Sequence, residues 1–408
     1  MSLPNTSTLH EKHYPALDGL RGIAALMVVA YHSASSYWLT NTFDKAYLRA
    51  TSFLWVGVDL FFILSGFLIT NILLDTKQSS TYFRTFYLRR FLRIFPLYYA
   101  FLVAIYIVVP ALGVKLPRNL ADVQIWQWTY TSNIYVGFHG WPNENINHLW
   151  TLAIEEQFYL LWPLVLFFLQ RNYLKISVIA LFLFLPFLRA SCLALGLSTN
   201  FIYTFTFCHM DGLLLGAILS LLVHEGLLET FKTMVISRFI RHFDWAITFI
   251  VAALGLLYCL VLRNDQFKFN ILTWPWYGQC IGVSLISLPL AYTVLRSISS
   301  DQNFLKRALS IPLLRSVGKY SYALYLLHMP VCYFVGAYFP VPHFLLSLPK
   351  EWSFLHSIYL IVMQFSLSIV AAILSWHILE KHFLKLKRYF PYRTSSDTED
   401  RLEFGPTT

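Results

Sequence analysis

Ionisable side chains stand inside several of the most apolar stretches of this sequence, where they could do acid–base chemistry. The five clearest are two histidines and three carboxylates: His32, Asp59, Glu155, Asp211 and His328. An ionisable group is costly inside a bilayer, so such groups usually serve function. An imidazole near a carboxylate can take a proton from a hydroxyl and be held in one tautomer while it does so. These residues are the first candidates for a buried site.

The five side chains share a predicted depth in the bilayer. Counted from the outer edges of the helices predicted below, they lie about six to ten residues in, which at 1.5 Å per residue is roughly 9–15 Å. A shared polar chamber would explain this common layer. The alternative is a set of hydrogen-bonded pairs that hold the helices together.

Arginines could bind an anion nearer the other side of the membrane. Arg21 and His32 are eleven residues apart, which puts both on one helix face about 16 Å from each other. Arg90 and Arg93 are separated by three positions and are neighbours on a helix face, with Arg84 and Arg89 close by. Guanidinium pairs suit phosphates, although ordinary anchoring of positive charge on the cytoplasmic side would also explain them.

The composition places these residues in a membrane protein. Apolar residues make up 57% of the 408 positions and charged residues only 13%, about half the charged share of a soluble protein. Such a chain cannot cover a globular surface with polar groups. This excludes a disordered, coiled-coil or ordinary cytosolic protein, and we expect an all-α integral membrane protein.

About ten segments have the roughly 20 mainly apolar residues that a helix needs to cross the hydrocarbon core. They are 17–39, 53–74, 91–113, 148–170, 174–195, 203–224, 245–262, 272–297, 316–338 and 354–380. A further segment, 120–138, is weaker because Gln124, Gln127 and Asn133 interrupt it. We interpret it as a re-entrant or interfacial segment.

The positive charge orients this bundle. There are 31 Lys and Arg against 21 Asp and Glu, a net charge of +10, and 23 of the 31 fall in the inner segments if the N-terminus is inside. Because cytoplasmic loops are enriched in Lys and Arg, we expect both termini in the cytoplasm and no nucleic-acid partner. The expected organisation is a polar tail (1–16), a transmembrane domain (17–383) and a basic, then disordered tail (384–408). The five cysteines show no ligand spacing, so we expect no metal site.

Six segments, in order, resemble the membrane acyltransferase-3 family of bacterial O-acyltransferases. They are LDGLRGIAALMVVAYH (17–32), GVDLFFILSGFLI (57–69), RRFLRIFPLYY (89–99), HLWTLAIEEQFYLLWP (148–163), DGLLLGA (211–217) and GKYSYALYLLHMP (318–330). The similarity runs over about 17 to 390, nearly the whole chain. It implies a ten-helix enzyme of the bacterial inner membrane that moves an acyl group, often acetyl, from acyl-CoA to a hydroxyl of a carbohydrate or glycolipid, with no permanently bound cofactor.

The resemblance also implies residue roles. The family's Arg-x10-His motif falls on Arg21 and His32, with His32 as the catalytic base, and its Arg-x-x-Arg motif falls on Arg90 and Arg93, which would hold the CoA phosphates. The acidic position of its Trp-Ser-Leu-x-x-Glu segment falls on Glu155, and Glu155 or Asp59 would orient the imidazole. Further residues occupy family-typical positions with open roles: Ser65, Gly66, Asp211, Tyr325 and His328.

Four positions depart from the family pattern. Thr151 stands where Ser is common, His209 where many members have Arg, Lys319 where Arg is frequent, and His382 where the usual residue is Pro. Thr151 keeps a hydroxyl, whereas His209 puts an anion contact at that position in doubt. None of these changes removes the core set of residues.

Two readings from other classes stay open. A proton-coupled transporter or flippase of a lipid-linked glycan would also bury histidines and carboxylates, although paired halves are not visible in the sequence. A non-enzymatic membrane partner is the third reading. The acceptor, the acyl chain, the oligomeric state and whether His32 is a base or carries the acyl group are left open by the sequence.

Overall fold

All regular structure in the described part of the chain is helical. A computed structural model describes residues 14–35, 41–113, 118–142, 146–227, 276–299, 303–347, 349 and 352–392. The helices before residue 228 are α1 (Pro15–Ser35), α2 (Thr42–Thr51), η1 (Leu54–Val56), α3 (Gly57–Thr76), α4 (Tyr82–Val103), η2 (Ala104–Val108), α5 (Val109–Ala111), α6 (Arg118–Asp122), α7 (Gln124–Trp128), α8 (Ser132–His139), α9 (Leu149–Phe168), α10 (Arg171–Ala194), α11 (Thr199–Thr204), η3 (Thr206–Cys208) and α12 (Asp211–His224). Those after residue 275 are α15 (Trp276–Ile298), α16 (Phe304–Leu309), α17 (Pro312–Lys319), α18 (Ser321–Tyr338), α19 (His343–Leu346), α20 (Phe354–Ser375), η7 (Trp376–Glu380), α21 (Lys381–Lys385) and η8 (Leu386–Tyr389).

Six helical stretches of the described chain are long and apolar enough to cross a membrane. They are Thr42–Thr76, Tyr82–Ala111, Leu149–Phe168, Arg171–Ala194, Gly278–Ile298 and Phe354–Tyr389. Each overlaps one of the ten spans expected from the sequence. The expected span 245–262 and the expected disordered end of the tail, 395–408, lie outside the described residues.

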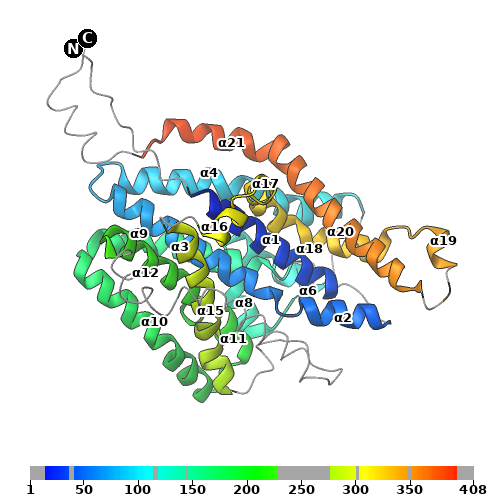
Figure 1. Cartoon of the computed structure of the whole chain (residues 1–408), viewed down its shortest axis with the longest axis horizontal. Coiled ribbons are helices and arrows are strands. Elements are labelled where there is room, and N and C mark those ends of the chain that lie inside the picture. The colour runs from blue at the N-terminus through cyan, green and yellow to red at the C-terminus, as the bar shows by residue number, and fades with distance from the viewer. Residues whose placement is uncertain are drawn as a thin grey trace, which may run out of the picture.

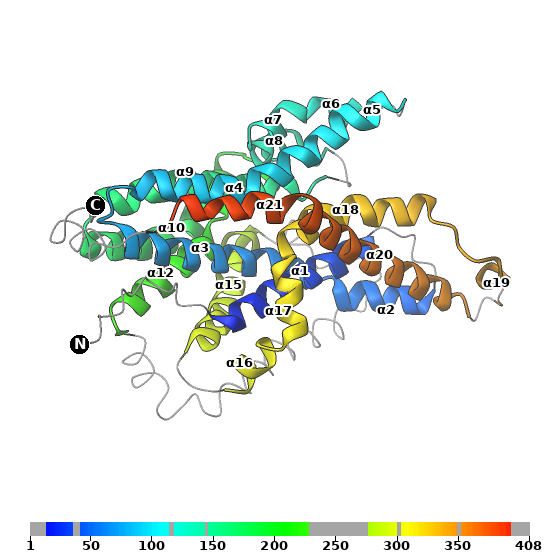
Figure 2. The same ribbon diagram turned by 90° about the horizontal axis from the view of Figure 1, so that it is seen from above.

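Three of the expected spans differ from the helices observed. Segment 203–224 is divided, because its apolar helix α12 begins only at Asp211 and has 14 residues. Segment 316–338 is divided at Tyr320, where α17 ends and α18 begins, and Figure 2 shows α17 crossing the direction of α18. Helix α4 begins at Tyr82, well before the expected residue 91. The weak segment 120–138 forms three short helices, α6, α7 and α8.

Helix α1 runs through the middle of the bundle, with α3, α17 and α18 packed around it (Figure 1). Glycines allow the closest crossings. A Cβ on Gly22 would overlap the Leu314 carbonyl oxygen of α17, and one on Gly66 of α3 would overlap the Leu213 carbonyl oxygen of α12. Lipid tails are as apolar as leucine, so helices in a bilayer pack through such small residues and close van der Waals contact.

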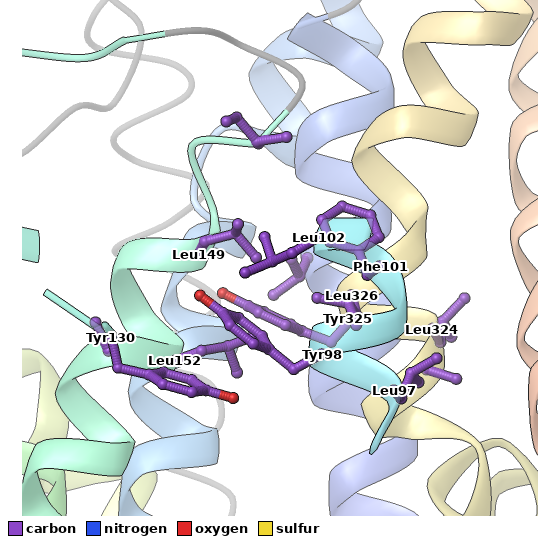
Figure 3. Packing of buried hydrophobic residues seen from close by; sticks show 14 of the residues in the cluster. Leu97, Tyr98, Phe101, Leu102, Tyr130, Leu149, Leu152, Leu324, Tyr325 and Leu326 are labelled. Atoms are coloured by element: carbon purple, nitrogen blue, oxygen red, sulfur yellow. The ribbon is translucent and has the colours of Figure 1, made fainter. Parts of the chain in front are cut away.

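One core cluster joins α4, α9 and α18. Figure 3 shows Tyr325 of α18 lying against Leu149 and Leu152 of α9, with Tyr98 and Leu102 of α4 beside them. The Tyr98 hydroxyl donates to the Gln127 carbonyl oxygen at 2.8 Å. This contact ties the short helix α7 to the core that α4, α9 and α18 form.

Polar contacts gather several helix ends at one end of the bundle, which we call the basic end. The Lys77 ammonium donates to the Leu169 carbonyl oxygen at 2.7 Å, and His224 contacts Asp75 at 2.9 Å. Lys175 pairs with Glu225 at 2.7 Å. The ends of α3, α9 and α12 and the start of α10 therefore lie together.

Candidate active site

Three arginines line one cavity in the bundle. Arg21 comes from α1, and Arg90 and Arg93 come from α4, on the extra turns that this helix has before residue 94. The cavity holds about 720 Å³ of space, its open mouth included. Its other walls are formed by Val58, Phe61, Phe62, Ser65, Leu68, Ile69, Ile94, Thr151, Leu152, Glu155, Glu156, Tyr159, Ser321, Tyr322 and Tyr325.

The guanidinium groups of this cavity have no anionic partner among the described residues. No ion pair or hydrogen bond joins Arg21, Arg90 or Arg93 to another residue of those ranges, and the Nε atoms of Arg21 and Arg90 are buried without an acceptor. The Arg90 guanidinium stacks 5.7 Å from the Tyr159 ring centroid. Three cations facing an enclosed space form a site suited to a multiply charged anion.

Glu155 belongs to this arginine cavity. Its Oε1 accepts a 2.7 Å hydrogen bond from the Ser65 hydroxyl, and Ser65 in turn accepts one of 3.0 Å from the Tyr159 hydroxyl. Glu156, the next residue, also lines the cavity. Both carboxylates come from α9.

Three histidines form a second cluster beside the cavity. His32 Nδ1 lies 3.0 Å from His328 Nε2 and 2.9 Å from the Val28 carbonyl oxygen. His328 Nδ1 donates to the Tyr325 carbonyl oxygen at 2.6 Å, and His148 Nε2 donates to the Leu326 carbonyl oxygen at 3.0 Å. His328 and His148 are buried, whereas His32 is half-buried.

Tyr325 connects the cavity to the histidines. Its hydroxyl hydrogen-bonds with the Thr151 hydroxyl, and both residues line the cavity. Thr151 also donates to the His148 carbonyl oxygen at 2.9 Å, and the Tyr325 ring centroid lies 5.7 Å from that of His328. A molecule bound by the arginines would therefore be separated from the histidine cluster only by the cavity wall that Tyr325 and Thr151 form.

Two further polar groups are separate buried pairs. Asp59 Oδ1 accepts from His209 Nε2 at 3.3 Å. Asp211 accepts from both terminal nitrogens of Arg189, at 2.8 and 3.2 Å, and from the Ser284 hydroxyl. These contacts join α3 to His209, two residues before α12, and α10 to α12 and α15. The imidazole of His209, a position that departs from the family pattern, thus contacts a buried carboxylate.

The five ionisable groups predicted to share one chamber do not form one connected set of hydrogen bonds in the described part of the chain. They divide into the arginine cavity with Glu155, the histidine cluster with His32 and His328, and the two buried pairs of Asp59 and Asp211. Hydrogen bonding is the physical reason, because each group at this depth takes its nearest complementary partner. The hydrogen bonds of Glu155 and Asp59 go to Ser65 and His209, and neither goes to His32, so the orienting role of these carboxylates stays a prediction.

His148 is a site residue that sequence reasoning missed. It stands at the N-terminal cap of α9, where the apolar run begins, and it therefore looks like a residue at a membrane edge. Its place in the family-like segment HLWT was the available signal. Among the described residues, no cluster of side chains is arranged to hold a metal ion.

Residues 14–379 match the family described as an acyltransferase domain, the acyltransferase-3 family. The chain belongs to this family. The membership agrees with the six apolar helices in indicating a membrane location. No solved structure shows a significant match to the chain.

Named relatives of this acyltransferase-3 chain are O-acetyltransferases. The chain is 31% identical over 353 residues to O-acetyltransferase OatA of Staphylococcus aureus, which covers 80% of this chain and 52% of that protein. It is 30% identical over 345 residues to peptidoglycan O-acetyltransferase OatA of Listeria monocytogenes, covering 81% of this chain and 51% of that protein. The chain thus spans about half the length of these relatives.

Proposed function

We propose that this protein is a membrane-bound O-acyltransferase that moves an acyl group from acyl-CoA to a hydroxyl of a carbohydrate acceptor. Acetyl is the acyl group that we propose. The observation that carries the proposal is the adjacency of two sites: a cavity whose three arginines form no ion pair with a described residue, and a histidine cluster separated from it by Tyr325 and Thr151. The names of the relatives support acetyl as the group and peptidoglycan or another envelope glycan as the acceptor.

The proposed donor site is the arginine cavity. The phosphates of acyl-CoA would bind through charge-assisted hydrogen bonds from Arg21, Arg90 and Arg93. The path of the pantetheine arm would be lined by the apolar residues Val58, Phe61 and Leu152. Glu155, held by Ser65, would balance part of the positive charge when the site is empty. The thioester would then reach the histidine cluster past Tyr325.

His32 is the proposed catalytic base. It would take the proton of the acceptor hydroxyl while that oxygen attacks the thioester carbonyl carbon; the carbon–sulfur bond then breaks, and the CoA thiolate takes the proton from His32. The products are the acyl ester and CoA. Holding both substrates at one point of the bundle would supply much of the rate enhancement through proximity.

The proposed topology follows from the charge distribution. We expect about ten transmembrane helices in the bacterial inner membrane, both termini in the cytoplasm, and the segment 120–138 as a re-entrant or interfacial part. The basic end would face the cytoplasm and acyl-CoA, while the half-buried His32 would receive the acceptor from the outer side. The acyl group would cross the membrane and CoA would not.

A transfer assay with the purified protein in nanodiscs tests this proposal. The wild-type protein should move label from [¹⁴C]acetyl-CoA to a soluble glycan fragment, and His32→Ala should lose this activity while keeping its yield and melting temperature. General base catalysis contributes roughly 10²–10⁴-fold. Wild-type rates in His32→Ala would exclude His32 as the base, and absence of any acylated product with the wild-type protein would favour the transporter reading.

A further inference from the structure

His328 holds a position next to His32 that a carboxylate occupies in many catalytic triads. We propose that His328 is a positioning residue that keeps His32 in the tautomer with its proton on Nδ1, so that Nε2 is the basic atom. This inference rests on the proposed acyl transfer at His32. It adds which nitrogen accepts the proton and which side chain, together with the Val28 carbonyl oxygen, holds the ring in that state.

The Val28 carbonyl oxygen places the proton on His32. A carbonyl oxygen can only accept a hydrogen bond, and it lies 2.9 Å from His32 Nδ1, four residues back along α1. Nδ1 must therefore be the N–H nitrogen. In a neutral imidazole the other nitrogen then carries the lone pair.

The Tyr325 carbonyl oxygen determines the tautomer of His328 by the same reasoning. It lies 2.6 Å from His328 Nδ1, so this nitrogen donates and Nε2 of the neutral ring can only accept. His328 Nε2 lies 3.0 Å from His32 Nδ1. One assignment satisfies all three contacts: the His32 Nδ1–H is shared between the Val28 oxygen and His328 Nε2.

His328 is built into the fold so that its ring keeps this orientation. It is fully buried on α18, and the ring of His148 packs 5.2 Å from it at an interplanar angle of 65°. His148 is itself held by the hydrogen bond from its Nε2 to the Leu326 carbonyl oxygen. His328 is thus held in place by His148, and His148 is held in turn by the backbone of α18.

A neutral acceptor suits a base in an apolar bundle. An unpaired carboxylate at this depth would be costly, whereas His328 leaves the resting site uncharged. During transfer the acceptor hydroxyl proton goes to His32 Nε2 as the carbon–oxygen bond forms, and it passes to the CoA thiolate as the carbon–sulfur bond breaks. The Nδ1 proton stays on His32 throughout, as in a Ser-His-Asp triad.

Two amide variants of His328 separate this role from simple packing. The oxygen of His328→Gln can reach the place of Nε2 and accept from His32. The shorter His328→Asn can keep a contact near the Tyr325 carbonyl oxygen but cannot reach His32. We expect kcat to fall roughly 10²–10⁴-fold in His328→Asn with an unchanged KM for acetyl-CoA, and His328→Gln to recover at least a tenth of the wild-type kcat.

The control variants are His32→Ala and His139→Asn, the second at an exposed histidine at the end of α8. His32→Ala should be inactive and His139→Asn should match the wild-type protein. Full activity in His32→Ala means that the proposed role of His32 as the base fails, whereas absence of product with the wild-type protein means that the proposed function itself fails. With His32→Ala inactive, any result in which His328→Gln does not exceed His328→Asn in kcat overturns the positioning role alone.

The tautomer can be measured without any His328 variant. In nitrogen-15 NMR spectra of the histidine-labelled wild-type protein in nanodiscs, the His32 signals are identified by their loss in His32→Asn. We expect a protonated Nδ1 and an unprotonated Nε2. The opposite tautomer in the resting protein overturns the proposal even if the variants fail to fold.

Discussion

At the scale of single residues, the cavity arginines and the arginine of the bundle interior have different partners. Arg21, Arg90 and Arg93 face open space, whereas the Arg189 guanidinium is 1% exposed and paired with Asp211. An arginine without an internal partner is available for a ligand, and one with a bidentate partner is a structural group. The two kinds predict different effects of substitution.

Removing one cavity arginine should weaken acyl-CoA binding. A hydrogen bond to a charged group contributes about 1.5–3 kcal/mol, so Arg90→Ala or Arg93→Ala should raise the Kd for acetyl-CoA roughly 10- to 100-fold. Calorimetry on the protein in detergent would measure this. Arg84→Ala, at an exposed position on the same helix α4, is the matched control. An unchanged Kd in both cavity variants would assign these arginines to membrane anchoring.

Breaking the interior ion pair should destabilise the protein. Asp211→Asn removes the charge that faces Arg189 and leaves a buried guanidinium uncompensated, which costs about 3–5 kcal/mol. A thermal-shift measurement should show a clearly lower melting temperature. Glu225→Gln, in the partly exposed pair with Lys175, should cost less than about 1 kcal/mol. Equal shifts for the two variants would contradict a structural role for the Arg189–Asp211 pair.

At the scale of secondary structure, small residues determine how closely the helices approach. Helix α12 crosses α3 where Gly212 and Gly216 face the backbone of that helix, and a Cβ on Gly216 would overlap the Ile63 carbonyl oxygen. Asp59 lies at the same crossing and pairs with His209, two residues before α12. The close approach of the two helices and the Asp59–His209 pair therefore depend on each other.

Filling this crossing should separate the two helices. Gly216→Leu forces backbone movement and should cost about 1–3 kcal/mol or more, seen as a lower melting temperature and a lower yield of folded protein. Ile218→Leu, two residues further along α12, conserves side-chain volume and serves as the control. A melting temperature of Gly216→Leu equal to that of the control would mean that α3 and α12 do not pack this closely.

At the scale of the whole molecule, the basic end and the histidine cluster belong to opposite parts of the bundle. The proposed orientation puts the basic end in the cytoplasm, which predicts the labelling of single cysteines in a cysteine-free background. On intact cells a membrane-impermeant maleimide should label Leu195→Cys, after α10, and leave Lys385→Cys, in α21, unlabelled until the cells are lysed. The reverse pattern would invert the proposed topology.

Much of the helix content and the main candidate residues could be predicted from the sequence. Long apolar runs predict helices whatever the tertiary arrangement is. The hydrocarbon core offers no water, so the backbone N–H and C=O groups must hydrogen-bond within the helix. The spacing in each of two pairs then predicts that both members lie on the same face of a helix: Arg21 with His32, and Arg90 with Arg93. The helix breaks at Tyr320 and before Asp211 were not predicted, and only the tertiary structure shows that one helix ends and another begins there.

The sequence by itself therefore determined which groups are costly in a membrane and that Arg21 and His32 lie at different heights on α1. Only the tertiary structure decided their partners. Depth is a one-dimensional quantity that residue counting supplies, whereas hydrogen bonds depend on distances of about 3 Å between separate helices. For that reason Glu155 belongs with Ser65, Asp59 with His209, and His32 with His328.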